Sequence, residues 1–169
     1  MTSKVILTAV GSDRPGLTQA LAETVYAAGG NWLESHLSRL GGKYVGSVLV
    51  EIEDVAAFER AIRAVDAVGL EVSIVPAGDA PAAAPGVQTI ELVGQDRPGI
   101  VREVTSVLAG LGVNIEDFAT TVENGAWSGE LLFRAVAKVA IPESLPADAV
   151  RAALEGISGE IMVDFSFAG

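Results

Sequence analysis

The sequence predicts an α+β protein made of two ferredoxin-like domains in tandem, each with the element order βαββαβ. Three observations support this prediction. The segment Gly11–Gly16 (G-S-D-R-P-G) returns at Gly94–Gly99 as G-Q-D-R-P-G, an interval of 83 residues. Apolar residues around both copies change from strand spacing to helical spacing in the same order. A run rich in Pro, Gly and Ala separates the copies, as expected of an exposed linker.

The repeat extends well beyond this segment. At the interval of 83 residues, the two copies align without a gap from Val10 and Val93 to Gly46 and Gly129. A duplication of this length indicates two copies of one small domain. We therefore expect a first domain at residues 1–77, a linker at 78–86 and a second domain at 87–169.

Each element of the first copy follows from its apolar spacing. Apolar runs and the glycines between them predict strands at Val5–Val10, Asn31–Leu40, Lys43–Glu53 and Leu70–Val75. Helical spacing predicts two helices, with apolar stripes at Leu17, Leu21, Val25 and Ala28, and at Phe58, Ile62 and Val65.

Boundary residues agree with these elements. Pro15 is expected at the first helical position, with Arg14 as the cap, because proline fixes a helical φ and disfavours helix at the preceding residue. Gly29-Gly30 should end this helix, and Asp54 should cap the next one. Gly41-Gly42 suits a tight hairpin between the two middle strands.

The second copy repeats the pattern. Strands are predicted at Val87–Val93, Asn114–Glu123, Ala126–Ala140 and Glu160–Phe167. The helix stripes are Ile100, Val104, Val107, Leu108 and Leu111, and then Val150, Leu154 and Ile157 in a helix that begins near Pro146. Asn124-Gly125 predicts a hairpin turn. Each domain should then form an antiparallel sheet with two helices on one face.

The strands of the first copy are apolar at successive positions, as in Val5-Ile6-Leu7 and Val48-Leu49-Val50. Such strands are typical of a sheet that is covered on both faces. We therefore expect the helices on one face and a neighbouring domain or chain on the other.

The composition excludes several function classes. The net charge is −11, from 22 acidic and 11 basic residues, so direct nucleic-acid binding and binding to anionic membranes are not expected. There is no cysteine and one histidine, which excludes thiolate chemistry, disulfides, and zinc or iron–sulfur sites. No segment resembles a signal peptide or a membrane span, and we expect a cytoplasmic protein.

The D-R-P-G segment is a candidate binding element. Unpaired N–H groups at a helix start and the helix dipole favour a carboxylate. Gly16 lets a ligand approach the first turn, and the carboxylate of Asp13 lies just outside it, where it could hold an ammonium group. The same argument applies to Asp96 and Gly99. These charges suit the zwitterionic head of an amino acid; the alternative is that D-R-P-G is only a stable helix start.

Asn31 and Asn114 open the strands that follow the first helix of each copy. In a split βαβ fold this position lies at the opposite end of the helix from D-R-P-G. The asparagine can therefore join a site with the turn only if a second domain brings it there. The alternative is that each asparagine is a turn residue.

Few other side chains suggest chemistry. His36 lies in a predicted strand, corresponds to Ala119 in the second copy and is expected to be a half-buried or surface histidine. Trp32, Tyr44 and Trp127 are expected in the core or at an interface.

These motifs resemble the ACT domain, a small regulatory module that binds amino acids. The resemblance rests on G-x-D-R-P-G with a hydrophobic residue after it, then a helix, and then G-G-N or G-V-N opening a strand. In tandem, over essentially the whole chain, these motifs most resemble the glycine cleavage system transcriptional repressor family.

The resemblance implies non-catalytic βαββαβ domains that pair side by side and bind a small amino acid at the interface, without a cofactor. The ligand-binding residues that it implies are Asp13, Arg14, Gly16, Leu17 and Asn31, and then Asp96, Arg97, Gly99, Ile100 and Asn114. A homodimer is expected. In repressor-like proteins regulation runs through contact with a separate DNA-binding activator, which agrees with the acidic composition.

Ligand size is a further implication. Some ACT domains carry a polar or histidine side chain where Gly11 and Gly94 stand here, and its absence favours glycine or a serine-like ligand.

Two other functions are compatible with the same fold. An acylphosphatase-like hydrolase would use Arg14 or Arg97 with an asparagine, but the expected G-x-V-x-G-V phosphate loop is missing. An RNA-binding module would need exposed aromatic residues on a basic sheet, which the central strands do not supply.

Overall fold

The computed structural model contains two compact units, Met1–Ala80 and Pro81–Gly169. Each unit has its own four-stranded sheet and its own buried core. The residues described are 1–66, 69–79, 86–126 and 129–166. Trp127, Phe167 and most of the linker expected at 78–86 lie outside these residues.

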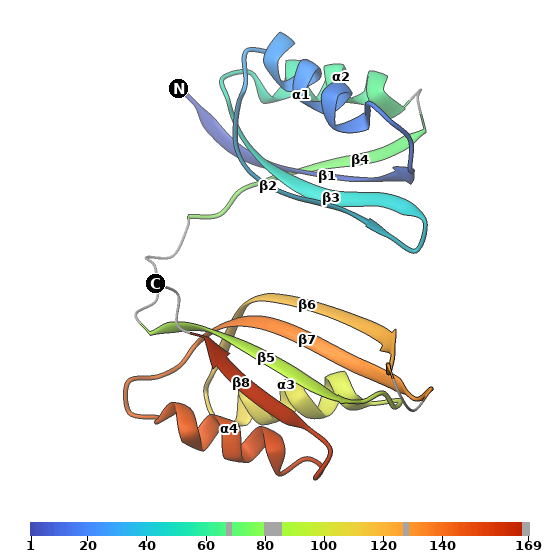
Figure 1. The fold of residues 1–169 in the computed structure, drawn as a ribbon. Helices are drawn as coiled ribbons and strands as arrows, with labels where there is room; N and C mark the ends of the chain where they lie inside the picture. Colours follow the sequence, from blue (N-terminus) through green and yellow to red (C-terminus); the bar gives the residue numbers. More distant parts are fainter. Residues whose placement is uncertain (67–68, 80–85, 127–128, 167–169) are drawn as a thin grey trace. The chain divides into compact units, whose positions relative to one another are not determined.

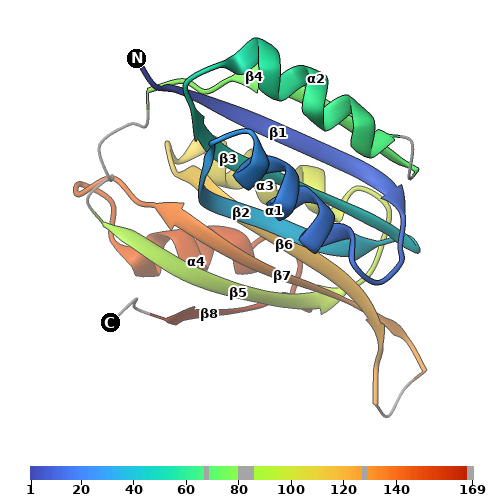
Figure 2. The same cartoon turned by 90° about the horizontal axis from the view of Figure 1, so that it is seen from above.

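The first unit is a βαββαβ domain, as the sequence predicts. Its elements are β1 (Ser3–Ser12), α1 (Leu17–Ala27), β2 (Asn31–Leu40), β3 (Lys43–Ile52), α2 (Val55–Asp66) and β4 (Leu70–Pro76). The strands form an antiparallel sheet in the order β2-β3-β1-β4, so β1 is paired on both sides. Helices α1 and α2 contact each other and lie on one face of this sheet (Figures 1 and 2).

The second unit has the same architecture. Its elements are β5 (Val87–Gln95), α3 (Ile100–Gly110), β6 (Asn114–Asn124), β7 (Leu131–Ala140), α4 (Ala147–Glu155) and β8 (Met162–Ser166). The antiparallel sheet has the order β6-β7-β5-β8, and α3 and α4 lie on one face of it (Figure 1). The fold class predicted from the sequence is confirmed in both units.

The two cores follow from the predicted periodicities. In β1, Val5 and Leu7 point toward the helices and are buried, and Leu21 and Val25 of α1 pack against them. Phe58 of α2 is fully buried in the same cluster, which removes a large apolar side chain from water. The core is mostly aliphatic, as expected for a chain with 5% aromatic residues.

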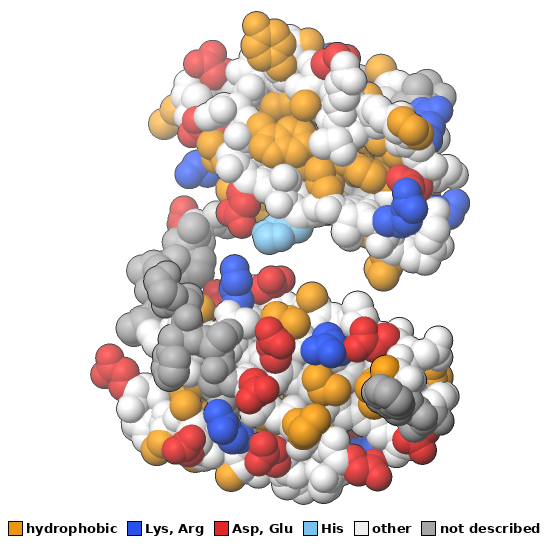
Figure 3. Space-filling view, in the orientation of Figure 1, with side chains coloured by type: hydrophobic (Ala, Val, Ile, Leu, Met, Phe, Trp, Pro, Cys, Tyr) orange, Lys and Arg blue, Asp and Glu red, His pale blue; other side chains and the backbone are white. Residues whose placement is uncertain are grey.

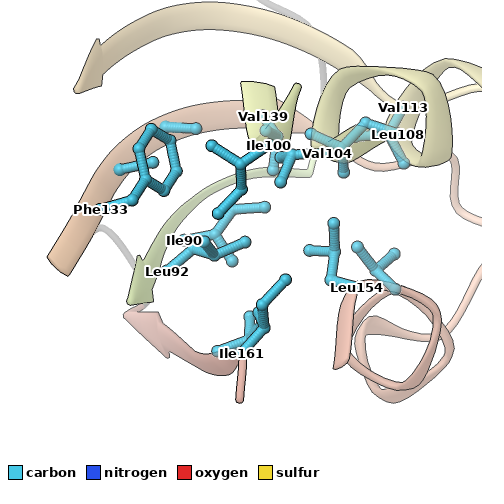
Figure 4. Packing of buried hydrophobic residues seen from close by; sticks show 14 of the residues in the cluster. Ile90, Leu92, Ile100, Val104, Leu108, Val113, Phe133, Val139, Leu154 and Ile161 are labelled. Carbon is cyan, nitrogen blue, oxygen red and sulfur yellow. The ribbon is translucent and has the colours of Figure 1, made fainter. Parts of the chain in front are cut away.

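The core of the second unit is shown in Figure 4. Ile90 and Leu92 of β5 face Leu108 of α3 and Leu154 of α4, and all four side chains are at most 3% exposed. Ile161, just before β8, closes this cluster from the side of the last strand. The buried residues come from both helices and the central strands, so each unit has a core of its own.

Glycine ends the first helix of each unit, as the sequence predicts. Gly29 has φ 73°, and the N–H groups of Gly29 and Gly30 donate to the carbonyls of Tyr26 and Val25. These are the two hydrogen bonds of a Schellman motif. Gly112 makes the equivalent turn after α3 with φ 71°. The following strand therefore starts in the same direction in both units.

One hairpin prediction is confirmed and the other is wrong. Gly41 and Gly42 have φ 57° and 76°, and they join β2 directly to β3. Neither Asn124 nor Gly125 has positive φ, and β7 begins at Leu131 and not at Ala126. The Gly125 N–H donates to the carbonyl of Glu130 (2.8 Å), closing a longer loop. Asn-Gly makes a two-residue hairpin only when both residues take left-handed φ.

This longer loop also corrects the alignment of the two copies. Gly11 pairs with Tyr44 in the first unit, whereas Gly94 pairs with Phe133 in the second. The interval is therefore 83 residues before the hairpin and 89 after it. Gly46 lies within β3 and Gly129 lies in the loop before β7, so these two glycines are not structurally equivalent.

The helix-free face of the first sheet is partly apolar. Ile6 and Leu49 are half-buried there, and Val10 and Val75 are each 47% exposed. The expectation that a neighbouring domain or chain covers this face stays a prediction.

Gly11 occupies a place where the backbone leaves no room for a side chain. A Cβ atom there would lie 2.3 Å from the carbonyl oxygen of Gly69 and 2.7 Å from Leu70 Cδ2. At the equivalent position, a Cβ on Gly94 would lie 3.0 Å from the side-chain atom Ile161 Cγ1 and 3.7 Å from the nearest backbone atoms. The two equivalent glycines therefore differ in what they tolerate.

We expect Gly11→Ala to destabilise the first unit by about 1–3 kcal/mol, because the β4 backbone must move to admit the methyl group. Gly94→Ala is the matched control and should destabilise the second unit less than Gly11→Ala destabilises the first, because a side chain and not the backbone must move. Urea unfolding followed by circular dichroism measures both values. Equal effects at the two positions would contradict this interpretation.

Candidate amino-acid-binding turns

The D-R-P-G segment forms the turn that reverses the chain between the first strand and the first helix of each unit. Gly16 has φ 90° and ψ −1°, and Gly99 has φ 92° and ψ −5°. These angles, with proline before the glycine, are those of a type II turn. In the second unit the Ile100 N–H donates to the carbonyl of Arg97 (3.3 Å), which closes the turn.

The helix start therefore differs from the prediction. Helix α1 begins at Leu17, and Gly16, not Arg14, is the N-cap, since its carbonyl accepts the first helical hydrogen bond from Ala20 (2.9 Å). Pro15 stands in the turn, not at the first helical position. Nothing lies within 4 Å of a Cβ built on Gly16, so glycine is needed here for its left-handed φ and not for close packing.

The turns leave the helix starts without a side-chain cap. The N-cap residues are Gly16 and Gly99, which have no side chain and make no capping hydrogen bond of this kind. Leu17 and Ile100 are each 3% exposed and point into the cores. At these two positions only the backbone could contact a ligand. N–H groups of a first helical turn are favourable partners for an anion, although in the second unit the Ile100 N–H is already used by the turn.

Strand residues surround the turn of the first unit. The carboxylate of Asp13 pairs with the guanidinium of Arg39, which comes from β2. The hydroxyls of Thr18 and Tyr44 are 2.9 Å apart, which fastens the first turn of α1 to β3. A hollow of about 400 Å³ lies beside β1 and is lined by residues that include Ser12, Lys43 and Glu71.

The turn of the second unit carries a different ion pair. Arg97 Nη1 donates to Glu103 Oε1 (2.8 Å), and Nη2 contacts the other carboxylate oxygen, so the pair is bidentate. The hydrogen bond from Arg97 lowers the pKa of the Glu103 carboxyl, and the same bond raises the pKa of Arg97. Glu160 adds to the negative potential around Arg97.

The asparagines lie at the far end of each unit from the turn. Asn31 pairs with Glu51 near the end of β3, whereas Ser12, just before the turn, pairs with Lys43 at its start. Eight residues of strand separate these positions, about 26 Å at 3.3 Å per residue. Neither unit therefore joins its own turn and its own asparagine in one site.

A β-bulge follows each asparagine. The register of β2 shifts between Trp32 and Glu34, and that of β6 shifts between Ile115 and Asp117. In the second unit, Asn114 Nδ2 donates to Glu116 Oε1 (2.6 Å) on the bulge. The equivalent bulge residue in the first unit is a leucine, Leu33, which is 40% exposed.

Sequence reasoning did not find the charged residues that contact these motifs. Arg39 comes from a distant strand and could not be assigned from local spacing. Glu103 lies in the first turn of α3, and Glu116 lies two residues after Asn114. Both are close in sequence to the motif residues that they contact, so local spacing could have identified them. Lys43, whose Nζ is 3.5 Å from Ser12 Oγ, was also missed.

Outside the two turns and the asparagines, few of the described side chains suggest a catalytic or binding role. The imidazole of His36 is 71% exposed and lies 3.2 Å from Glu34 Oε1, so the prediction of a surface histidine is confirmed. Tyr44 is buried and Trp32 packs against the core, also as predicted. Within the described ranges, no group of three or more acidic or histidine side chains could hold a metal ion. None of the described helices is long and apolar enough to cross a membrane.

Acidic side chains are spread over the surface. On the face drawn in Figure 3, Asp and Glu of the second unit lie among basic and apolar side chains, and no continuous basic area forms there.

We expect Gly16→Ala and Gly99→Ala each to destabilise their unit by about 1–2 kcal/mol, because an L-residue at this left-handed φ is strained. Gly110→Ala is the control: Gly110 ends α3 with open space around its Cα, and alanine favours helix. Thermal unfolding should show lower midpoints for the first two variants and no loss for the third. A Gly110→Ala loss as large as theirs would contradict the argument.

The Arg97–Glu103 pair should make stability depend on pH. Since the pKa of Glu103 is lowered in the folded state, the pair stabilises above the ordinary glutamate pKa, and this contribution is lost as pH falls through the lowered value. Glu103→Gln should remove the part of the pH dependence of the free energy of unfolding that the pair causes. Carboxyl NMR titration measures the pKa directly, and Arg97→Ala should return it toward its usual value. An unchanged pKa in that variant would refute the assignment.

Comparison with known proteins agrees with this architecture. Residues 3–71 and residues 88–154 each match a family model of the ACT domain. The structure of an unknown protein from Galdieria sulphuraria is similar over 100% of both chains, at 26% identity and a TM-score of 0.83. A candidate glycine cleavage system transcriptional repressor is similar over 99% of both chains, at 15% identity and a TM-score of 0.76, which concerns the fold alone.

The comparison with curated proteins finds no significant match. The two segments that match ACT-domain models together span most of the chain, one in each unit. This chain therefore belongs to the ACT domain family, with two ACT domains in tandem.

Proposed function

We propose that this protein is a non-catalytic regulator that binds a small amino acid between paired ACT domains. The observation that carries the proposal is the repeated uncapped helix start behind a left-handed glycine, beside charged side chains. The turn supplies backbone N–H groups for the ligand's carboxylate, and Asp13 or Asp96 supplies a carboxylate for its ammonium group. Arg14 and Arg97 belong to the same turns.

The other half of the site comes from the asparagine of a second ACT domain. Asn31 and Asn114 each open a strand about 26 Å along the sheet from the turn of their own unit. An asparagine amide can donate to a carboxylate and accept from an ammonium group, which suits an amino-acid head. Pairing of domains, within the chain or in a homodimer, would then complete the site.

The same separation argues against a hydrolase. An acylphosphatase-like site would need an arginine and an asparagine on one substrate. Arg14 and Asn31 lie at opposite ends of the first unit, so they could not act together within it.

The surroundings of Gly11 favour a small ligand. The Gly69 carbonyl oxygen lies 2.3 Å from the place of a Cβ on residue 11, so this strand position disfavours a side chain that could contact that of a ligand. Glycine or serine therefore fits better than a larger amino acid.

Regulation would act through a protein partner. With a net charge of −11 the chain is a poor ligand for nucleic acid, so control of transcription would run through contact with another protein, such as a DNA-binding activator. The fold shared with a candidate glycine cleavage system transcriptional repressor supports this direction.

Isothermal titration of ligand-free protein with the twenty amino acids tests the proposal. Glycine or serine should bind, and a ligand at 100 times its Kd should stabilise the fold by about 2.7 kcal/mol. Asn31→Ala should weaken binding about tenfold or more, since it removes a hydrogen bond to a charged group. Asn124→Ala, at the end of β6 and outside both motifs, is the control and should bind normally. No heat and no thermal stabilisation with any amino acid would refute amino-acid binding.

A further inference from the structure

The two repeats share the backbone of the turn but not its charges. Around the turn of the first unit, three cations stand with two carboxylates: Arg14, Arg39 and Lys43 with Asp13 and Glu71. The formal charge of this group is positive. An anionic ligand group is therefore favoured at this helix start by both the dipole and the side chains.

Around the turn of the second unit the balance is reversed. Two cations, Arg97 and Arg102, stand with three carboxylates, Asp96, Glu103 and Glu160. The formal charge of this group is negative, which disfavours an incoming carboxylate.

Glu103 is the residue that differs most directly. It lies in the first turn of α3 and forms the bidentate pair with Arg97. An acidic side chain at this position also interacts with the positive end of the helix dipole. The equivalent residue in α1 is Ala20, which has no charge and is half-buried, as Glu103 is.

The surroundings of the asparagine also differ between the repeats, and again the second repeat has the additional carboxylate. Glu116 accepts a hydrogen bond from the Asn114 amide at 2.6 Å. Leu33 stands at the equivalent bulge position beside Asn31 and carries no acceptor. In the second repeat, one glutamate therefore lies beside the helix start and another contacts the asparagine amide, and the equivalent residues of the first repeat, Ala20 and Leu33, are apolar.

Resting on the function proposed above, with like repeats paired across a homodimer, we infer that the two repeats are not equivalent: a site built from first repeats binds the amino-acid carboxylate, and Glu103 and Glu116 close a site built from second repeats to it. Glu103 places an internal carboxylate on Arg97 beside the helix start, and Glu116 places one on the Asn114 amide that the ligand would use. A ligand must then displace them and also enter a region of negative potential. The chain should accordingly bind one amino acid at high affinity, and not two.

Exchange of residues between the repeats tests this inference by isothermal titration with glycine and serine. Ala20→Glu places the carboxylate of the second repeat in the first, and it should weaken binding about tenfold or more through like-charge repulsion. Ala20→Gln has nearly the same size without the charge, and its affinity should stay within about threefold of the wild type. Thermal unfolding checks that both variants are folded.

Exchange in the other direction, which removes the two glutamates, should allow the second repeat to bind an amino acid. The double variant Glu103→Ala, Glu116→Leu should bind two amino acids per chain where the wild type binds one. Two equal sites in the wild type, or Ala20→Glu binding as tightly as Ala20→Gln, would overturn the inference and leave amino-acid binding intact. No binding by either the wild type or the opened double variant would instead remove the proposed function, and this inference with it.

Discussion

The fold of each domain depends on a tight reversal of the chain between its first strand and its first helix. The first strand is the central partner of the sheet, paired on both sides, and the helix after it must return directly over it. A type II turn with proline before a left-handed glycine achieves this reversal within a few residues. The turn has a chemical consequence as well, because its glycine N-cap offers no side chain to the N–H groups of the first helical turn.

The duplication preserved the backbone features and changed the charges. Both units keep the left-handed glycine of the turn, the glycine that ends the first helix, the asparagine after it and the bulge in the strand that it opens. Around these features the first unit holds Asp13 with Arg39, and the second holds Arg97 with Glu103. A backbone requirement admits few residue types, whereas the charges around it can change without loss of the fold.

The local patterns predicted the elements well because apolar runs mark the strands and apolar stripes mark the helices. The apolar run Val5-Ile6-Leu7 in β1 and the stripe of Leu21 and Val25 in α1 needed no tertiary information, since short apolar runs and a period of 3.6 residues are typical of strands and helices themselves. The errors arose where one sequence suits two local geometries. Asn124-Gly125 lies in a longer loop and not in a tight hairpin, and Pro15 precedes a left-handed glycine instead of opening the helix.

The sequence by itself determined the order of the elements, their buried faces, the duplication and the groups that each motif presents. It also placed each asparagine at the far end of the helix from its turn, because the length of a helix and a strand is set by residue count. Only the tertiary structure decided which charges meet at the two turns. Asp13 contacts Arg39 because β2, β3 and β1 are neighbours in one sheet, and strand pairing is a long-range event that local spacing does not encode.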